Sequence, residues 1–432
     1  MTNQSPKLSG RYRWAIVAML WFICFFNYAD RVAIASVFPI LQSKYHFTKA
    51  ELGLIAAAFT WVYAAFAPIA GVVGDRYPRK YVILAGLYIW SAITGLTSLC
   101  TRVWQFVAVR GAEGLGETFY FPASMALISD YHTGATRSRA IGLHQTSIYA
   151  GTIFGGSVAG LLAEKHGWQT PFWAFAAAGI VLGVVLSIFI REPIRNQAEK
   201  AEIAANTSET QQKSTSSDNV PLSVFWRDLR QTPTALRLLA AYFGANLVGF
   251  VFLTWMPTFL KEKFHVNLAM AGLGGTFFIQ AASMIGAIAG GIAADKRVRA
   301  RLQGRIEVQA AAILLGAPFV FICGWTTNGL VLMLAMSLFG FCKGSYDASL
   351  TSAYYDVISP DRRSTSTGVM NLIGWIGAGL GSISVGYAVD HGLTMSAAIS
   401  STALIYLIVG VTLWLTSRSD AVVDIQRARG AR

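Results

Sequence analysis

The chain has 432 residues, of which 54% are hydrophobic and only 13% are charged, and its formal net charge is +13. Because a soluble domain carries roughly 25% charged residues, this composition excludes an ordinary soluble protein and indicates one with many membrane-spanning segments. All four cysteines fall in apolar runs without C-x-x-C pairing, so we expect neither a disulfide framework nor a metal site. They are Cys24, Cys100, Cys323 and Cys342.

Twelve apolar segments follow one another, each close to the roughly 20 residues that a transmembrane helix needs. They are predicted at 12–38, 50–74, 81–100, 103–131, 138–164, 169–191, 235–260, 267–294, 306–325, 328–356, 365–389 and 394–417. The first is too long for a signal-peptide core and is expected to remain as a helix. The predicted units are an N-terminal six-helix bundle (1–191), a polar cytoplasmic linker (192–233), a C-terminal six-helix bundle (234–417) and a cytoplasmic tail (418–432).

Lysine and arginine are distributed unevenly between the two sides that this order of segments defines. With the N-terminus in the cytoplasm, 26 of the 35 basic residues fall in cytoplasmic segments and 6 fall in outer loops. The positive-inside rule therefore places both termini and the linker in the cytoplasm. Because this topology explains most of the basic charge, we expect no nucleic-acid partner.

The two halves of the sequence carry an internal repeat. At an offset of 226 residues, one aspartate, one arginine and four glycines coincide with the same residue types. The pairs are Asp130 and Asp356, Arg137 and Arg363, Gly142 and Gly368, Gly151 and Gly377, Gly155 and Gly381, and Gly160 and Gly386. Two related six-helix halves are the arrangement with which many transporters form a central site at the repeat interface.

The fourth apolar segment contains the stretch RGAEGLGETFYFPA, residues 110–123. Arg110, Glu113 and Glu117 are spaced i, i+3 and i+7 and therefore share one face of a helix. An ionised side chain within a bilayer costs about 3 kcal/mol or more, so it normally faces a water-filled cavity or a partner. The cluster predicts a transport pathway, with a structural ion pair as the alternative. Glu113 suits the structural role better, because it lies one turn from Arg110.

The loop after the second segment, GVVGDRYPRK at 71–80, resembles the cytoplasmic loop signature of the major facilitator superfamily, with Pro78 where glycine is usual. That resemblance covers nearly the whole chain. It implies an all-α polytopic membrane protein with twelve transmembrane helices in two pseudo-symmetric six-helix halves. The charges of the loop and of its second-half counterpart can form a cytoplasmic latch that breaks when the protein opens inward. The predicted gating residues are Asp75, Arg76, Arg79, Asp295 and Lys296.

Four stretches resemble the anion:cation symporter family, which includes sugar-acid transporters, sialin and vesicular glutamate transporters. They are NYADR at 27–31, the stretch from Arg110 to Glu117 with its following FPA, TWMPTFLKE at 254–262 and GVMNLIGW at 368–375. This resemblance implies proton coupling through the acids of helices 1 and 4, and carboxylate binding and charge balance by their arginines. The implied proton-coupling residues are Asp30 and Glu117. The implied substrate-binding residues are Tyr28, Arg31, Tyr63, Arg110, Gln145 and Asn371.

The stretches NYADR, GDRYPRKY and GLGETFY also resemble the Spinster lipid transporters. The helix 11 stretch GVMN suits the symporters instead, so a Spinster-like transporter of lipids or amphiphiles is the alternative function. A sensor with a transporter fold is a further alternative, which the lack of a recognisable signalling domain disfavours.

The tenth segment carries Lys343 and Asp347, four residues apart and on one helix face. The two charges can simply neutralise each other as a structural pair. Alternatively, they contact the far end of the substrate or rearrange during transport, so we include both among the candidate substrate-binding residues. At the repeat offset Lys343 takes the place of Glu117, so the two halves are not electrostatic copies.

The sequence thus predicts a secondary active transporter, not an enzyme: no nucleophile–base pair, metal cluster or phosphate-binding loop is recognisable. We expect proton-coupled symport of a small organic anion by alternating access, without a cofactor. The expected partners are the organic anion, protons and the lipid bilayer. The expected location is the cell (inner) membrane, and a monomer is expected to function because one chain contains both halves.

Overall fold

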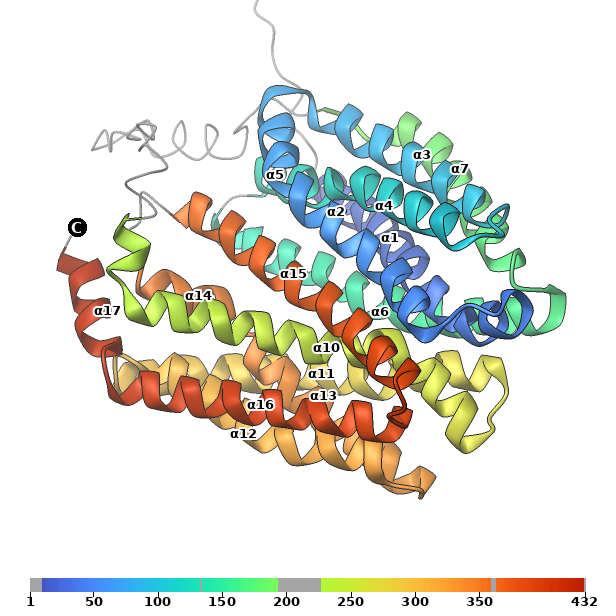
Figure 1. Cartoon of the computed structure of the whole chain (residues 1–432). Helices are drawn as coiled ribbons and strands as arrows, with labels where there is room; N and C mark the ends of the chain where they lie inside the picture. The colour runs from blue at the N-terminus through green and yellow to red at the C-terminus, as the bar shows by residue number, and fades with distance from the viewer. Residues whose placement is uncertain (1–9, 133, 193–226, 359–362, 431–432) are drawn as a thin grey trace, which may run out of the picture.

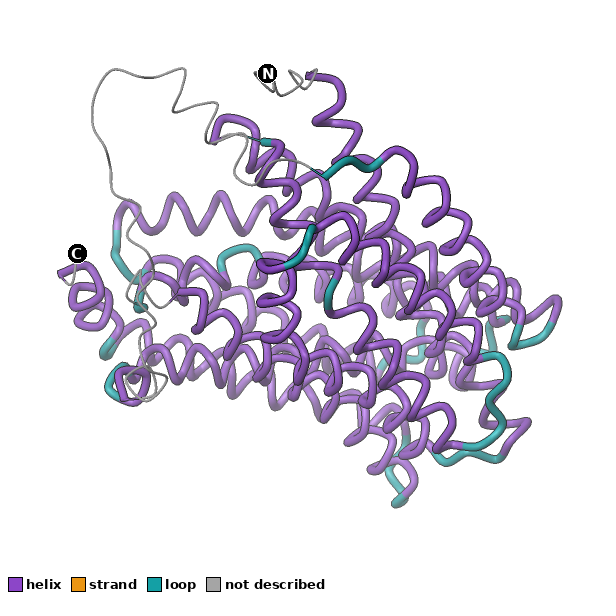
Figure 2. The backbone as a smooth tube through the Cα atoms, turned by 90° about the horizontal axis from the view of Figure 1, so that it is seen from above, coloured by secondary structure: helices purple, strands orange, loops and turns teal. Residues whose placement is uncertain are grey.

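The computed structural model describes residues 10–132, 134–192, 227–358 and 363–430, and within these ranges the chain is helical with short loops (Figure 2). The side chains of Asp75, Ser138 and a few residues at helix ends also lie outside the description. The first half consists of α1 (Gly10–Tyr45), α2 (Lys49–Arg76), α3 (Arg79–Thr97), α4 (Val103–Thr118), α5 (Tyr120–Tyr131), α6 (Gly134–His166) and α7 (Thr170–Phe189).

The second half consists of α10 (Pro233–Phe264), α11 (Leu268–Ala300), α12 (Gly304–Trp325), α13 (Gly329–Asp347), α14 (Leu350–Asp356), α15 (Arg363–Asp390), α16 (Met395–Arg418) and α17 (Ala421–Gly430). Most of the predicted linker falls on residues 193–226, outside the described part of the chain. The predicted tail contains α17. Among the described residues, eleven helical spans are long and apolar enough to cross a membrane.

The remaining one of the twelve expected spans is the fourth in the chain, 103–131, and it is divided into α4 and α5. The reason is local: Pro122 has no backbone N–H to donate to the carbonyl of Thr118, and its ring crowds that carbonyl. Helix α4 accordingly ends at Thr118, and α5 begins after Phe119. A similar division separates α13 from α14 near the equivalent position, although no proline explains it there. Together, α4 and α5 fill the place of the expected fourth helix.

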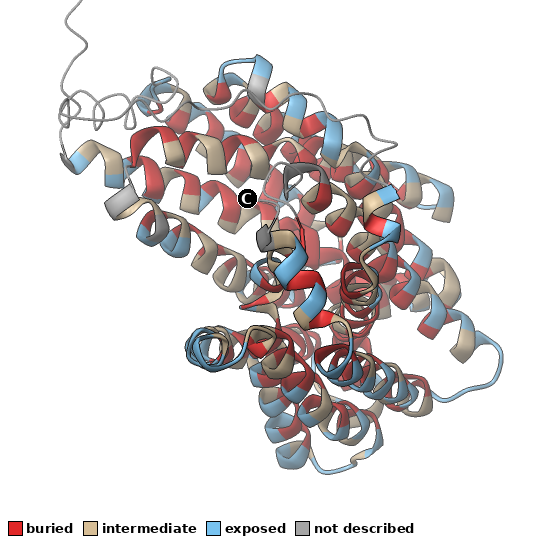
Figure 3. Cartoon of the chain, turned by 90° about the vertical axis from the view of Figure 1, so that its left-hand side faces the viewer, coloured by how far each residue is buried: buried red, intermediate tan, exposed pale blue. Residues whose placement is uncertain are grey.

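The helices of the two halves gather on opposite sides of the molecule, and α2 and α6 of the first half pack against α15 and α11 of the second (Figure 1). Buried residues line the faces where helices meet, and exposed residues cover the outside (Figure 3). The outside remains apolar: Ile188 is 72% exposed and Ile288 is 65% exposed. An exposed apolar surface of this kind is suited to lipid contact.

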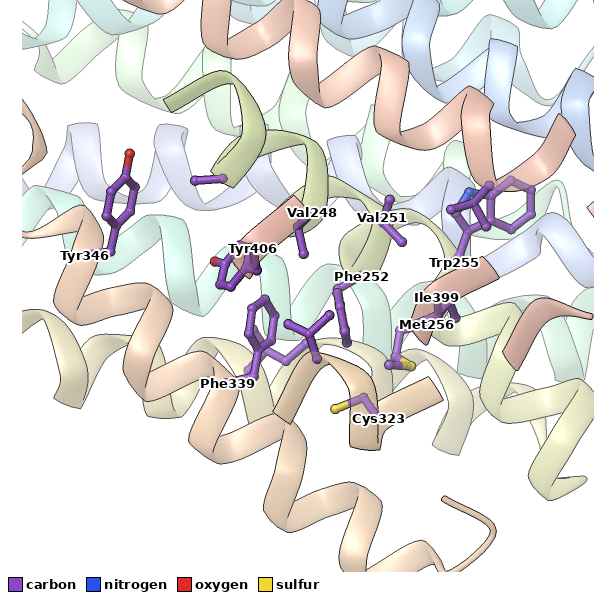
Figure 4. Packing of buried hydrophobic residues seen from close by; sticks show 14 of the residues in the cluster. Val248, Val251, Phe252, Trp255, Met256, Cys323, Phe339, Tyr346, Ile399 and Tyr406 are labelled. Carbon is purple, nitrogen blue, oxygen red and sulfur yellow. The ribbon is translucent and has the colours of Figure 1, made fainter. Parts of the chain in front are cut away.

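The core of the second half is apolar and aromatic (Figure 4). The rings of Phe252 on α10 and Phe339 on α13 lie 4.5 Å apart, and Tyr406 on α16 lies 5.6 Å from Phe339. All three side chains are at most 1% exposed. Close aromatic packing of this kind fixes the positions of α10, α13 and α16 relative to one another.

The repeated glycines explain how equivalent helices meet within each half. A Cβ atom on Gly155 would overlap the backbone of Ala29, so α6 lies directly on α1. A Cβ atom on Gly381 would overlap the carbonyl of Leu247, so α15 lies directly on α10 in the same way. These matched contacts align α1 with α10 and place Gly249 at the position equivalent to Arg31.

The two halves are closed against each other at the end that carries the loops near residues 46–48 and 265–267, called here the far end. There Gly386 of α15 packs on the carbonyl of Lys49, and Gly160 of α6 packs on the carbonyl of Leu268. These contacts join the halves, and the two glycines are themselves one repeat apart.

Two carboxylates add polar contacts to the far end. Asp390 accepts hydrogen bonds from the backbone N–H groups of Lys49 (3.0 Å) and Ala50 (2.6 Å) at the start of α2. Glu164, one repeat earlier, accepts a hydrogen bond from the backbone N–H of Ala269 (3.0 Å) at the start of α11. Each half therefore caps a helix N-terminus of the other half, where N–H groups lack partners and the helix dipole favours negative charge.

At the opposite end, called here the linker end because the chain leaves and re-enters the described structure there, the halves have separated. A Cβ atom on Gly71, Gly142 or Gly368 would meet no described atom within 4 Å. Gly142 on α6 and Gly368 on α15 are again one repeat apart, so equivalent positions of the two halves lack a close neighbour at this end.

Candidate functional site

A buried ion pair between α1 and α4 forms the centre of the site. Arg31 donates from Nη2 (2.7 Å) and Nε (3.2 Å) to the same oxygen, Oε2, of Glu117. Arg31 also donates to Asn27 Oδ1 at 3.2 Å, one turn earlier on α1. The side chains of Arg31 and Glu117 are 6% and 0% exposed. Arg31 Nη1 and Glu117 Oε1 have no hydrogen-bond partner among the described residues, so both partners have free bonding capacity.

Aromatic rings surround the guanidinium of Arg31. Its Cζ lies 4.3 Å from the ring centroid of Tyr28, 4.8 Å from Phe59, 5.3 Å from Tyr63 and 5.5 Å from Trp375. Three of these rings come from the first half and Trp375 comes from α15 of the second. Cation–π attraction strengthens where water is excluded, so the rings hold the guanidinium at the interface between the halves.

Arg110 occupies a deeper position and is 2% exposed. It donates to Glu113 Oε2 at 2.6 Å and to the backbone carbonyl of Arg31 at 3.1 Å. Its Cζ lies 4.8 Å from the centroid of Phe59, the same distance as that of Arg31, so this ring lies beside both guanidinium groups. Arg110 therefore supports the backbone that carries Arg31, and Glu113 neutralises Arg110.

Asp30 is the remaining acid of the cluster and is 1% exposed. Neither of its oxygens has a hydrogen-bond partner among the described residues, although the indole of Trp90 lies nearby. Glu113, Glu117 and Arg110 all act on it electrostatically. The cluster thus combines two arginines with three carboxyl groups, and Asp30 is the carboxyl group without a cation of its own.

Glycines in the RGAEGLGE stretch bring these charges together. A Cβ atom on Gly114 would lie 2.5 Å from the carbonyl oxygen of Phe59, so α4 lies against α2. A Cβ atom on Gly116 would lie 3.3 Å from the side chains of Ile89 and Trp90 on α3. The glycines therefore bring α4 close to α2 on one side and close to α3 on another, while Glu117 on the same helix reaches α1.

A second ion pair lies on α13. Lys343 Nζ is 2.5 Å from Asp347 Oδ2, and the two side chains are 27% and 36% exposed. The Lys343 side chain crosses Gly249 of α10, where an added Cβ would lie 3.3 Å from its Cε. Tyr149 on α6 and Tyr242 on α10 both lie near Lys343 and Asp347.

Two further predicted substrate-binding residues are half-buried near these groups. Gln145 on α6 lies one turn before Tyr149, and Asn371 on α15 lies one turn before Trp375. Spacing of four residues places each of them on the same helix face as the aromatic residue that follows.

The predicted gating residues lie at the linker end. Arg79 pairs with Asp130 and donates to the carbonyl of Ala126, within the first half. Asp295 lies 3.7 Å from Arg305, within the second half. Arg76 and Lys296 are exposed, and the side chain of Asp75 lies outside the described residues.

A family model for the Major Facilitator Superfamily matches residues 20–382. The chain belongs to the major facilitator superfamily. This membership and the helical architecture confirm the predicted family and fold, and they make the chain a multi-pass membrane transporter rather than an enzyme. No group of three or more potential metal ligands occurs among the described residues.

The chain's relatives include transporters of acidic sugars and other anions. It is 25% identical to the hexuronate transporter of Bacillus subtilis (strain 168) over 89% of each chain. It is 26% identical to the probable galactarate/D-glucarate transporter GudP of Escherichia coli (strain K12) over 99% of this chain and 96% of that protein. It is 28% identical to the protein spinster homolog 1 of Bos taurus over 83% of this chain and 69% of that protein.

Among solved structures, the fold resembles that of a bacterial homologue of the human lysosomal transporter Spinster in an inward-facing, unoccupied conformation. The TM-score is 0.80, the sequence identity is 19%, and the match covers 95% of this chain and 98% of the other. At this identity the match establishes a shared fold.

The structure adds residues that the sequence analysis did not select. Phe59 and Trp375 approach the guanidinium of Arg31, and Tyr149 and Tyr242 lie beside the Lys343–Asp347 pair. Aromatic residues are common in membrane helices, so composition alone does not distinguish these four from lipid-facing ones. A usable signal was helical spacing: Phe59 is four residues before Tyr63, and Trp375 is four residues after Asn371.

Proposed function

We propose that this chain is a secondary active transporter that couples protons to the symport of a small organic anion, a sugar acid or a related carboxylate, by alternating access. Its similarity to transporters named for hexuronate and for galactarate and D-glucarate supports the substrate class. The superfamily membership supports transport between two related halves.

The observation that carries this proposal is the fork of Arg31 on a single oxygen of Glu117. A guanidinium can hold a carboxylate through two parallel N–H groups, one to each oxygen, whereas here both N–H groups reach one oxygen and leave Glu117 Oε1 and Arg31 Nη1 without a partner among the described residues. A substrate carboxylate has the same shape as the glutamate that now occupies Arg31. The glutamate therefore acts as an internal substitute for the substrate. Its protonation weakens the pair and releases Arg31 for the incoming anion.

Charge balance assigns roles to the two coupling acids. With both arginines charged, three ionised carboxylates would leave the cluster with one excess negative charge, so we assign a proton to Asp30, whose oxygens have no partner among the described residues. A second proton on Glu117 then offsets the charge of one bound substrate carboxylate. Tyr28 and Tyr63 contact the bound anion beside Arg31, with Gln145 and Asn371 reaching its other side.

Alternating access follows from the two ends of the interface. The basic linker end is assigned to the cytoplasm by the positive-inside rule, which also places both termini there in a cell (inner) membrane. The present separation at the linker end then corresponds to an inward-open state. In the outward-open state the gating charges Asp75, Arg76, Arg79, Asp295 and Lys296 join the two halves, while the contacts made by Glu164 and Asp390 break.

Purified protein in proteoliposomes provides the test. An imposed inward proton gradient should drive accumulation of a labelled sugar acid by the wild type, and Asp30→Asn and Glu117→Gln should each reduce it at least tenfold. Asp420→Asn, which alters an exposed ion pair with Arg237, is the matched control and should behave like the wild type. Undiminished proton-driven accumulation in both site variants would overturn the proposal.

Transport of a lipid or amphiphile is a second candidate, supported by the 28% identity to a spinster homologue and by the shared fold. A thermal-shift screen of sugar acids against lysophospholipids separates the two candidates, because a ligand that binds the native state stabilises it. Stabilisation by sugar acids alone supports the first candidate, and stabilisation by lysophospholipids alone supports the second. In either case the single chain, which contains both halves, is proposed to work as a monomer.

A further inference from the structure

The ion pair of Lys343 and Asp347 differs from the central pair in its accessibility. Its side chains are 27% and 36% exposed, against 6% and 0% for Arg31 and Glu117. An accessible i, i+4 pair contributes only about 0.3–0.5 kcal/mol to stability. Charged residues in a membrane helix are costly unless they face a water-filled cavity or a partner, and where they are kept they usually mark a transport pathway. A purely structural role therefore does not account for the pair.

The pair faces the other half of the protein. The adjacent face of α13 carries Gly340 and Gly344, which pack on the α11 backbone, so that face is occupied. Lys343 itself crosses Gly249 of α10, and Tyr149 of α6, in the first half, lies near the pair. The pair therefore has neighbours in both halves, which places it at their interface and not in the lipid.

The repeat gives the position of this pair relative to Arg31. Lys343 is the counterpart of Glu117, and the helix contacts described above make Gly249 the counterpart of Arg31. In the first half, the side chain of Arg31 on α1 reaches Glu117 on α4. In the second half, Gly249 has no side chain, and the side chain of Lys343 lies in the space that this leaves. Tyr242, beside Asp347, also lies near Tyr28, beside Arg31. The two ion pairs therefore approach one binding region from opposite halves.

The pair offers a defined chemistry. The ammonium of Lys343 donates hydrogen bonds, the carboxylate of Asp347 accepts them, and the net charge is zero. A hydroxyl group both donates and accepts, so neighbouring hydroxyls on a carbon chain satisfy both partners. A second carboxylate finds no net positive charge here, and Asp347 repels it. Selection of this kind depends on a repulsive element as well as an attractive one.

Resting on the proposed function, we propose that Lys343 and Asp347 form a second substrate subsite that binds the hydroxylated tail of a sugar acid and selects substrates with one carboxylate over those with two. Arg31 binds the carboxylate at one end of the molecule. The neutral pair binds the other end.

The test compares D-gluconate with D-glucarate, which share a six-carbon hydroxylated chain and differ in having one or two carboxylates. In proteoliposomes, the wild type should take up D-gluconate at least tenfold more efficiently. Asp347→Asn leaves the charge of Lys343 without a counter-charge, so the preference should fall at least tenfold. The double variant Lys343→Gln/Asp347→Asn keeps a neutral hydrogen-bonding pair and should retain the preference for one carboxylate. Arg237→Gln/Asp420→Asn is the matched control for loss of an ion pair.

The outcomes separate this inference from the proposed function. If no sugar acid is transported by the wild type, the proposed function fails and the subsite assignment fails with it. If both acids are transported but the wild type prefers D-glucarate, or Asp347→Asn leaves the ratio unchanged, the subsite assignment alone is overturned. Should Asp347→Asn fail to fold, thermal shifts of the wild type decide, because equal stabilisation by the two acids contradicts the inference.

Discussion

Equivalent positions on α4 and α13 carry charged residues in the first half and mainly apolar residues in the second. In the first half, α4 presents Arg110, Glu113 and Glu117 to a buried charged cluster. At the repeat offset of 226 residues, the first two positions become Met336 and Phe339, which are 1% and 0% exposed in the apolar core of the second half. The third becomes Lys343, whose partner is Asp347 on the same helix.

The repeated glycines at which helices touch occur in both halves, although the charged positions differ. Gly155 and Gly381 bring equivalent helices together in both halves, and Gly160 and Gly386 join the halves at the far end. A repeat therefore fixes where helices touch, because backbone contact tolerates no side chain there. It leaves the chemistry of neighbouring positions free to differ, so proton handling can be concentrated in one half.

The largest expected effect comes from imposing the chemistry of the first half on the second. Phe339→Glu buries a carboxylate without a cation, which costs about 3–5 kcal/mol by analogy with broken buried pairs, so the folded fraction should fall sharply. Met336→Arg/Phe339→Glu supplies a partner at the spacing of Arg110 and Glu113 and should recover part of the loss. Thermal unfolding of detergent-solubilised protein measures both. If the single and double variants lost equal stability, an ion pair would not offset the cost of burying the glutamate at this position.

Removing the cation of the central pair should abolish transport. Arg31→Ala leaves Glu117 without its fork and removes the proposed carboxylate-binding group, so uptake should fall to background. Arg31→Lys keeps the charge but not the two-point geometry, and a loss of at least tenfold is expected, equivalent to about 1.4 kcal/mol. Arg297→Lys, on an exposed pair, serves as the control. Near-normal uptake by Arg31→Lys would mean that charge alone is recognised.

The two ends of the interface should respond differently to the same substitution. Gly386→Leu collides with the carbonyl of Lys49 and should prevent closure of the far end. Gly368→Leu meets no described atom within 4 Å and should leave the present state intact, while hindering closure of the linker end. Spin labels at Ser43 and Leu330 report the distance across the far end. It should lengthen in Gly386→Leu and stay unchanged in Gly368→Leu; the reverse pattern would contradict the assigned states.

The smallest effect is expected from the paired carboxylate caps. A carboxylate at a helix N-terminus contributes about 0.3–2 kcal/mol, so Asp390→Asn and Glu164→Gln should each shift the population a few-fold toward far-end opening. The same spin-label pair measures this shift. Asp390 accepts two backbone hydrogen bonds and Glu164 accepts one, so Asp390→Asn should have the larger effect. An effect confined to one of them would show that only one cap holds the far end closed.

Sequence patterns were sufficient to predict much of this protein. Segment length, loop charge and the motif at 71–80 predicted the family and the helical fold, because the bilayer admits few architectures. The motif at 110–123 marked the helix that carries Arg110, Glu113 and Glu117, since charged residues are rare and costly inside a membrane. The repeat identified glycines at which helices touch, with Gly142 and Gly368 as the exceptions.

Pairing within the cluster was decided by tertiary structure. Spacing along one helix favoured Glu113 as the partner of Arg110, and in the folded chain Arg110 does bind Glu113. The pairing of Glu117 with Arg31 joins two helices, so spacing along one helix could not establish it. The approach of Trp375 to Arg31 and the far-end caps of Glu164 and Asp390 likewise depend on contacts between distant segments. A sequence records which side chains share a helix face, but the register between helices is set by packing. The contacts between helices therefore became visible only in three dimensions.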